Sequence, residues 1–99
     1  MSTLSTHVLD AGLGSPAAGL AVIPDDTVEA VTDADGRIRF EAEVGAGNHT
    51  LRFATAAWFG DRPHFHPEVT VAFDVDPDRA HHHVALLLGP YSYTTYRGS

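Results

Sequence analysis

Residues 81–99 read HHHVALLLGPYSYTTYRGS, and this stretch indicates the fold more clearly than any other part of the chain. Three histidines lead into an apolar run that ends at Leu88, and Gly89-Pro90 interrupts it. A run rich in Tyr and Thr follows. Two extended runs separated by a Gly-Pro turn are typical of two strands folded back on each other. We therefore expect strands over residues 81–88 and 92–96, and we expect the last residues to be ordered rather than frayed.

Alternating or continuous apolar runs predict further strands upstream. In residues 37–44 charged and apolar side chains alternate, which is the pattern of a strand with one buried face. Residues 69–75 alternate between apolar and mostly polar side chains in the same way. Shorter runs predict strands over residues 6–10, 18–23, 27–32 and 49–54.

Turn-forming residues separate these runs. Asp35-Gly36 is the strongest turn signal, because Gly adopts positive φ freely and Asp tolerates it. Residues 55–62 could form one helical turn, which Pro63 and Pro67 prevent from extending. About eight short strands with turns between them predict an all-β fold, either an antiparallel β-sandwich or a small barrel. The length of 99 residues predicts a single domain over residues 1–99.

The composition argues against several classes of protein. The chain has no cysteine, so neither a disulfide framework nor a thiolate nucleophile is available. The formal charge of -7 argues against a sequence-independent nucleic-acid binder, which needs a basic surface. The apolar run 84–88 is too short to span a membrane, and the N-terminal residues do not resemble a signal peptide. We expect a soluble cytoplasmic protein with no nucleic-acid or membrane partner.

Histidine is the unusual feature of the composition, with seven in the chain. Because side chains alternate between the faces of a strand, His81 and His83 project from one face and His82 from the other. His7 lies on the predicted first strand, and Arg37 directly follows the Asp-Gly turn. A hydrolase that uses no metal needs a base for water and donors for the developing negative charge. Two histidines and an arginine could supply both to a small-molecule substrate.

The same residues allow two other interpretations. The imidazoles of His7, His81 and His83 could form a zinc site that activates water, although no nearby carboxylate offers obvious support. Alternatively, the strand histidines and Arg37 are structural or solvated side chains with no chemical role.

The remaining histidines offer weaker evidence for chemistry. His64 and His66 lie beside prolines and are expected in a loop, and His49 is expected at the surface. No Ser/His/Asp triad is detectable, because nothing around Ser99 resembles the sharp turn that presents a nucleophilic serine.

Four segments of the chain share a recognisable pattern. They are STHVLD at 5–10, TDADGR at 32–37, FHPEV at 65–69, and the stretch from HHHVALLL at 81–88 to YRGS at 96–99. In this order, and along almost the whole chain, they resemble the 5-hydroxyisourate hydrolases of the transthyretin-like family. The terminal Tyr-Arg-Gly-Ser is the specific part of the resemblance, since it separates these hydrolases from transthyretin itself, the hormone carrier of the same fold.

The resemblance implies roles for individual residues. The family's catalytic histidine, arginine and second histidine fall on His7, Arg37 and His83. In this interpretation the two histidines deprotonate water and return a proton, while Arg37 holds the anionic or enolic substrate. Ser99 would line the site through its hydroxyl or terminal carboxylate. The implied substrate-binding residues are Tyr96, Arg97, Gly98 and Ser99.

The resemblance also implies the assembly and the reaction. The fold would be a transthyretin-like β-sandwich with one short helix, and the protein a homotetramer whose active sites lie between subunits. The reaction would be hydrolytic opening of the 5-hydroxyisourate ring to 2-oxo-4-hydroxy-4-carboxy-5-ureidoimidazoline in urate degradation, without metal or cofactor. The chain departs from the family pattern between Val22 and Thr32, where it is shorter, and at Ala85, where proline is usual. The alternative function is a non-catalytic module that binds a small aromatic ligand.

Overall fold

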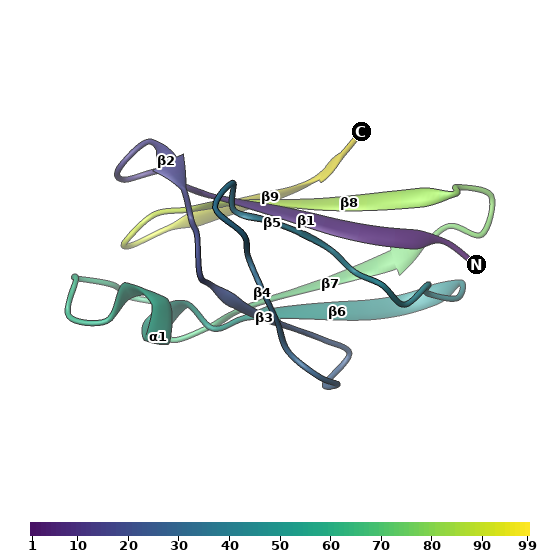
Figure 1. The fold of residues 1–99 in the computed structure, drawn as a ribbon, viewed down its shortest axis with the longest axis horizontal. Helices are drawn as coiled ribbons and strands as arrows, with labels where there is room; N and C mark the ends of the chain where they lie inside the picture. The colour runs from purple at the N-terminus through teal and green to yellow at the C-terminus, as the bar shows by residue number, and fades with distance from the viewer.

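The computed structural model describes residues 1–99 as two packed β-sheets and one short helix (Figure 1). The first sheet contains β1 (Thr3–Asp10), β2 (Ser15–Pro16), β5 (Arg37–Arg39), β8 (His81–Leu88) and β9 (Tyr93–Gly98). The second sheet contains β3 (Ala21–Pro24), β4 (Ala30–Val31), β6 (Gly47–Phe53) and β7 (Val69–Val75). The helix α1 (Thr55–Phe59) lies at one end of the second sheet. No helix here has the length or the apolar character to cross a membrane.

β1 is the central strand of the first sheet. It pairs in parallel with β8 along one edge, and on its other edge with β5 near its start and β2 at its end. β9 pairs antiparallel with β8 and forms the outer edge. Every other strand pair in the molecule is antiparallel, as the sequence predicts. A parallel β1–β8 pair is possible because these strands lie far apart in the sequence, so no tight turn has to join them.

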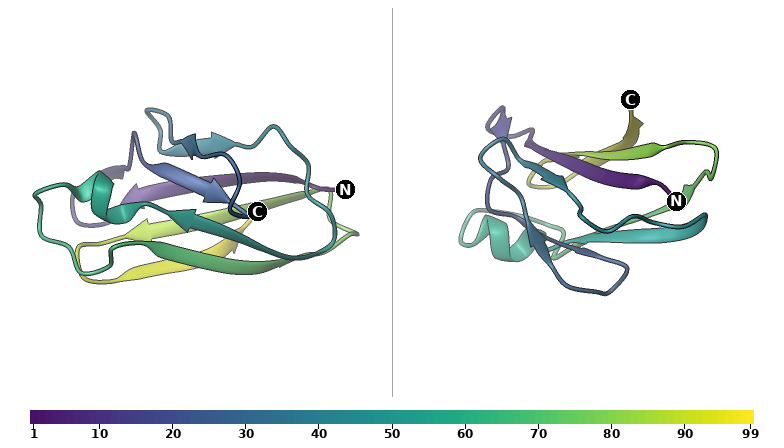
Figure 2. Two further views of the ribbon diagram at one scale, coloured as in Figure 1. Left: turned by 90° about the horizontal axis from the view of Figure 1, so that it is seen from below. Right: turned by 45° about the vertical axis from the view of Figure 1, so that its right-hand side comes forward.

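The core lies between the two sheets, which Figure 2 shows stacked on each other. Leu4 and Val8 of β1 point into it, whereas Ser5 and His7 point to the opposite face and are only half-buried. Burying a large apolar side chain stabilises the fold by roughly 1.5–3 kcal/mol. The buried core side chains are Leu4, Val8, Ala17, Leu20, Val22, Ile38, Leu51, Phe53, Phe59, Val69, Val71, Val84, Leu86 and Leu88. The outer face of the first sheet is left to polar side chains.

The predicted Asp-Gly turn is present between β4 and β5. The Asp33 carboxylate accepts hydrogen bonds from the backbone N–H of Asp35, at 2.9 Å, and of Arg37, at 3.0 Å. Gly36 takes positive φ in this turn, at 74°, whereas Asp35 does not. A Cβ at Gly36 would lie 2.3 Å from the carbonyl oxygen of Val8, which makes this glycine necessary for the approach of the turn to β1.

The strands predicted at 69–75 and 81–88 are confirmed with those bounds, but the strand predicted at 37–44 ends at Arg39. Phe40 still donates to the carbonyl of Leu4, and Val44 bridges Ser2. Between these two contacts the segment advances four residues, from Phe40 to Val44, while the opposite strand advances two, from Leu4 to Ser2. Residues 41–43 therefore loop out of the pairing. Alternation alone could not reveal this, because it continues through the loop.

Other strand boundaries also differ from the prediction. Gly19 takes a φ of 79°, so the strand expected at 18–23 begins only at Ala21. The returning strand expected at 27–32 shrinks to Ala30–Val31, and β9 runs to Gly98 rather than ending at Tyr96. The short β2 lies in a segment for which no strand was predicted. The bounds of β4 and β9 depend on their pairing with β3 and β8, which local alternation does not specify.

Candidate functional site

The candidate residues lie on the outer face of the first sheet, in two neighbouring rows that cross its strands. Strand register places them, because residues paired across strands project from the same face. The first row is Arg39, Ser5, His83 and Gly98, and the second is Arg37, His7, Ala85 and Tyr96. The sheet thus brings His7, Arg37 and His83 together, although they lie in three separate parts of the sequence. The chain also ends on this side of the sheet (Figures 1 and 2).

A cavity of about 460 Å³ opens on this face. Its lining is mostly polar and includes Arg37, Arg39, His81, His83 and Ser99. Neither arginine forms an ion pair with a carboxylate of the chain. Two unpaired guanidinium groups beside two imidazoles suit a small anionic or enolic molecule, since guanidinium donates to such oxygens in a fixed fork.

His83 is held on two sides. Its Nδ1 lies 2.6 Å from the hydroxyl of Ser5. On the other side, a Cβ at position 98 would lie 2.4 Å from the His83 Cδ2, so the ring occupies space that only Gly98 leaves free. Burial lowers the pKa of His83, and the neighbouring His7, Arg37 and His81 lower it further. His83 is therefore neutral at neutral pH, which is the state that a general base requires.

His7 is anchored through its other ring edge to the Asp-Gly turn. Its Nε2 lies 2.9 Å from the carbonyl oxygen of Asp35, which only accepts, so Nε2 carries the proton and donates it. In neutral His7 the Nδ1 is therefore free to accept. The pairing of His7 with Arg37 in the β1–β5 ladder keeps both side chains on one face.

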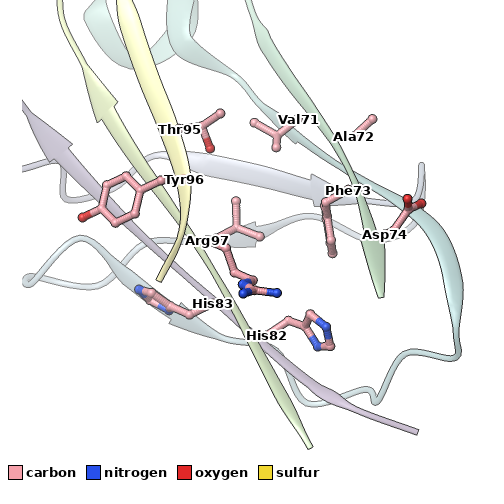
Figure 3. A pocket seen from close by; sticks show the side chains of 10 residues that line it. Val71, Ala72, Phe73, Asp74, His82, His83, Thr95, Tyr96 and Arg97 are labelled. Carbon is pink, nitrogen blue, oxygen red and sulfur yellow. The ribbon is translucent and has the colours of Figure 1, made fainter. Parts of the chain in front are cut away.

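The four C-terminal residues do not all reach this face. Gly98 packs on His83 and Ser99 lines the cavity, whereas Arg97 leaves β9 on the opposite side from Tyr96 (Figure 3). Arg97 instead lines a separate cavity of about 210 Å³ between the sheets, together with Phe73 and His82. The structure thus does not bring Arg97 to the cavity of Arg37 and His83. Alternation along β9 explains this, since its neighbours in sequence must face opposite ways.

His82 faces inward, as predicted. It is 3% exposed, and its Nε2 accepts a hydrogen bond of 3.1 Å from the backbone N–H of Asp76. Burial lowers the pKa of His82, with a further contribution from Arg79. The zinc-site alternative is not supported by the geometry, because no three His, Asp or Glu side chains lie close enough together to hold a metal ion.

Sequence reasoning missed Ser5 and Arg39 as members of the site. Ser5 lies two residues before His7, and Arg39 two residues after Arg37, so each shares a strand face with a residue that was identified. That period of two was the available signal. The expected loop position of His64 and His66 is confirmed, but His49 is not a surface residue, since its side chain is only 18% exposed and pairs with Asp25.

Comparison with known proteins is consistent with this arrangement. A family model described as the HIUase/Transthyretin family matches residues 4–98. A 5-hydroxyisourate hydrolase of Caulobacter vibrioides is 39% identical over an alignment 115 positions long, gaps included, which covers 100% of both chains. The solved structure of Klebsiella pneumoniae 5-hydroxyisourate hydrolase superposes with a TM-score of 0.88 at 37% identity, covering 100% of this chain and 94% of the other.

The same fold also carries a different function in a solved relative. Sea bream transthyretin in complex with thyroxine superposes with a TM-score of 0.84 at 34% identity, covering 96% of this chain and 93% of the other. The expected all-β, transthyretin-like sandwich with one short helix is thus confirmed. Fold, sequence and family model agree over nearly the whole length of the chain, which therefore belongs to the HIUase/transthyretin family.

Proposed function

We propose that this protein hydrolyses 5-hydroxyisourate in urate degradation, opening the ring to 2-oxo-4-hydroxy-4-carboxy-5-ureidoimidazoline. Homology to hydrolases over the full length supports the reaction. The observation that carries the proposal is the placement of His7, Arg37 and His83 on one sheet face beside a cavity with unpaired arginines. A thyroxine carrier has no need of a neutral histidine beside such arginines.

In the proposed mechanism His83 is the general base. Its Nδ1 is engaged with Ser5, so its Nε2 takes the proton of the attacking water. Arg37, with Arg39 beside it, holds the anionic or enolic substrate and stabilises the negative charge that develops on the attacked carbonyl oxygen. No metal or cofactor takes part in any of these steps.

His7 acts on the other side of the proton transfer. Its Nε2–H is committed to the carbonyl of Asp35, so the Nδ1 is the atom that handles a proton at the substrate. The bond between the attacked carbonyl carbon and the ring nitrogen breaks, and the proton taken from water is returned to that nitrogen. Ser99 borders the bound molecule, and Gly98 makes room for His83. Arg97 has no role in this monomeric geometry.

We further propose that the site is completed by assembly into a homotetramer. On its own the face with His7 and His83 is open, and Tyr96 on the same face is 54% exposed. A second subunit placed over this face would exclude water and strengthen the electrostatic interactions inside. A solution mass of about four times 10.6 kDa is expected by light scattering, and a monomer would contradict the proposal.

One assay separates the enzyme from a binding module. Purified protein is mixed with freshly generated 5-hydroxyisourate, and the loss of its ultraviolet absorbance is compared with the spontaneous rate. We expect acceleration that scales with protein concentration. An unchanged rate, together with saturable binding of thyroxine or a similar aromatic ligand, would instead assign the carrier function of the sea bream relative.

A further inference from the structure

We propose that Ser5 and His81 are positioning residues, which hold His83 in the tautomer whose Nε2 is free to act as a base. They do so through a chain of hydrogen bonds that starts at the carbonyl of Ala80. The proposal rests on the hydrolytic function proposed above, because it concerns the base of that reaction. It adds two residues that work without touching the substrate.

The chain of hydrogen bonds runs across β1 and β8. Strand register places Thr3 opposite His81, and Ser5 opposite His83. The hydroxyl of Thr3 lies 2.5 Å from His81 Nδ1, the hydroxyl of Ser5 lies 2.8 Å from His81 Nε2, and the same hydroxyl lies 2.6 Å from His83 Nδ1. Two hydroxyls and two imidazoles therefore alternate in one continuous chain.

The direction of the chain follows from the number of protons available. Thr3 has one hydroxyl proton, and it donates this to the carbonyl oxygen of Ala80 at 3.3 Å. His81 Nδ1 must then be the donor to Thr3, so in neutral His81 the Nε2 is unprotonated and accepts from Ser5. Because Ser5 also has only one proton, its oxygen accepts from His83 Nδ1–H. The Nε2 of His83 is left unprotonated.

The packing of the His83 ring supports the same tautomer. Ser5 lies at the Nδ1 edge, and Gly98 packs against Cδ2 on the other edge. A flip of the ring about its Cβ–Cγ bond would exchange Nδ1 with Cδ2, and the ring would then lose its hydrogen bond to Ser5. Tautomer and orientation are set together, which is how a supporting group acts on a catalytic histidine.

Protonation of His81 would reverse the direction of the hydrogen bonds from His81 through Ser5 to His83. Cationic His81 donates from both nitrogens, so Ser5 must accept from it and turn its own proton toward His83 Nδ1. His83 then carries its proton on Nε2 and no longer acts as a base. The charged and titratable groups that face this pair are His7 of β1, Arg37 and Arg39 of β5, Asp33 of the turn, and the terminal carboxylate of Ser99.

The first test reads the tautomer without substrate. In isotope-labelled protein above the ordinary histidine pKa of about 6.5, imidazole nitrogen chemical shifts distinguish Nδ1–H from Nε2–H. We expect Nδ1–H at His83 in the wild type and in Ser5→Thr, which keeps the hydroxyl. Ser5→Ala should shift the population to Nε2–H. Finding Nε2–H in the wild type would overturn the proposal, whether or not the protein hydrolyses 5-hydroxyisourate.

The second test is kinetic. Ser5→Ala should lower kcat about 10–100-fold with little change in KM, by analogy with the loss of partners that orient metal-bound histidines. Ser5→Thr should restore most of the rate. His81→Gln can still accept a hydrogen bond from Ser5, so it should keep more activity than His81→Phe. Because Gln cannot be protonated, the rate of this variant should fall less than that of the wild type when the pH is lowered.

A matched control is His64→Phe, because His64 stacks on Phe59 in a distant loop and lies outside the chain of hydrogen bonds. It should leave kcat and its pH profile unchanged. If Ser5→Ala and His81→Phe match the wild type while His83→Ala is inactive, the positioning role is wrong and the hydrolase stands. If the wild type itself does not accelerate the reaction, the proposed function fails. The tautomer measurement then still decides whether the hydrogen bonds from Thr3 to His83 run in the inferred direction.

Discussion

His83 and His49 are both half-buried strand histidines, one in each sheet, and their partners give them opposite properties. His83 in β8 contacts a hydroxyl and is surrounded by His7, Arg37 and His81, which join burial in lowering its pKa. His49 in β6 lies between the carboxylate of Asp25, at 2.6 Å, and the carbonyl oxygen of Gly45, at 2.7 Å. Both of its partners only accept, so both of its nitrogens must donate.

The His49 contacts form a structural clamp. The hydrogen bond to Asp25 raises the pKa of His49, against the opposing effect of burial. Burial tends to raise the pKa of Asp25, but the bonds from His49 and from the Thr50 N–H outweigh it and lower that pKa. Asp25 is one of two non-glycine residues with positive φ, and the clamp joins this tight turn to β6.

The difference teaches that burial and neighbouring groups together, rather than residue type, decide what a histidine does here. A neutral imidazole near an arginine is available as a base, whereas an imidazole between two acceptors keeps both protons and links two loops to β6. Variants that exchange the two behaviours are therefore the sharpest tests.

The largest effect is expected from His83→Ala. Loss of a general base costs about 10²–10⁴-fold in rate, so kcat for 5-hydroxyisourate should fall by that factor. The melting temperature should change little, because this face is outside the core. His49→Ala is the matched control and should show the reverse, lower stability with kcat preserved. A fully active His83→Ala protein would remove His83 from the mechanism.

Gly98→Ala should come next in size. The added Cβ would lie 2.4 Å from His83 Cδ2, so the ring must shift, and a displacement of about 1 Å can cost about 10²-fold in rate. Gly45→Ala is a suitable control, since its Cβ would meet only Met1 Sδ at 3.8 Å and its carbonyl would still accept from His49. Steady-state kinetics of both variants should separate them, and equal activities would refute the packing argument.

A smaller effect is expected from Asp25→Asn, and it falls on stability. Replacing the carboxylate weakens the bond to His49, which should cost about 1 kcal/mol because the pair is partly open to solvent. Urea unfolding measures this loss, while kcat should stay unchanged. Asp26→Asn is the control, since Asp26 is 86% exposed and lies 3.6 Å from Arg52. Equal losses in the two variants would mean that the clamp adds nothing specific.

The smallest effect is the pH dependence of that loss. Since the folded pKa of His49 is raised, its contribution is full below the ordinary value of 6.5 and disappears as pH rises through the raised pKa. Since the folded pKa of Asp25 is lowered, its contribution is full above 3.8 and disappears as pH falls through the lowered pKa. The stability difference between wild type and Asp25→Asn should therefore be largest between these values, as unfolding at a series of pH values would show.

Acidification should lower the activity, although the contribution of His49 to stability is full below pH 6.5. The lowered pKa of His83 keeps it neutral at neutral pH, and kcat should fall only when the pH drops below 6.5 and through that lowered value. A rate that rises on acidification would show that His83 does not act as a base.

Much of the fold was accessible from local pattern. The alternation at 69–75 and the apolar run at 81–88 correspond to β7 and β8 as observed, because strand period and turn residues are local properties. The faces of His81, His82 and His83 followed from the same period. The bulge after Arg39, the short β4 and the extension of β9 to Gly98 did not, since each depends on a partner strand elsewhere in the chain.

Sequence alone established the all-β class and the family to which the chain belongs, and it predicted His7, Arg37 and His83 as the catalytic residues. Only the tertiary structure decided that Ser5 lies between His81 and His83, that Arg97 faces away from the cavity, and that His49 is clamped by Asp25. The physical reason is that these relations are contacts between strands or loops distant in sequence. A pattern of residue types specifies which face a side chain takes, but the register between strands specifies what it meets there.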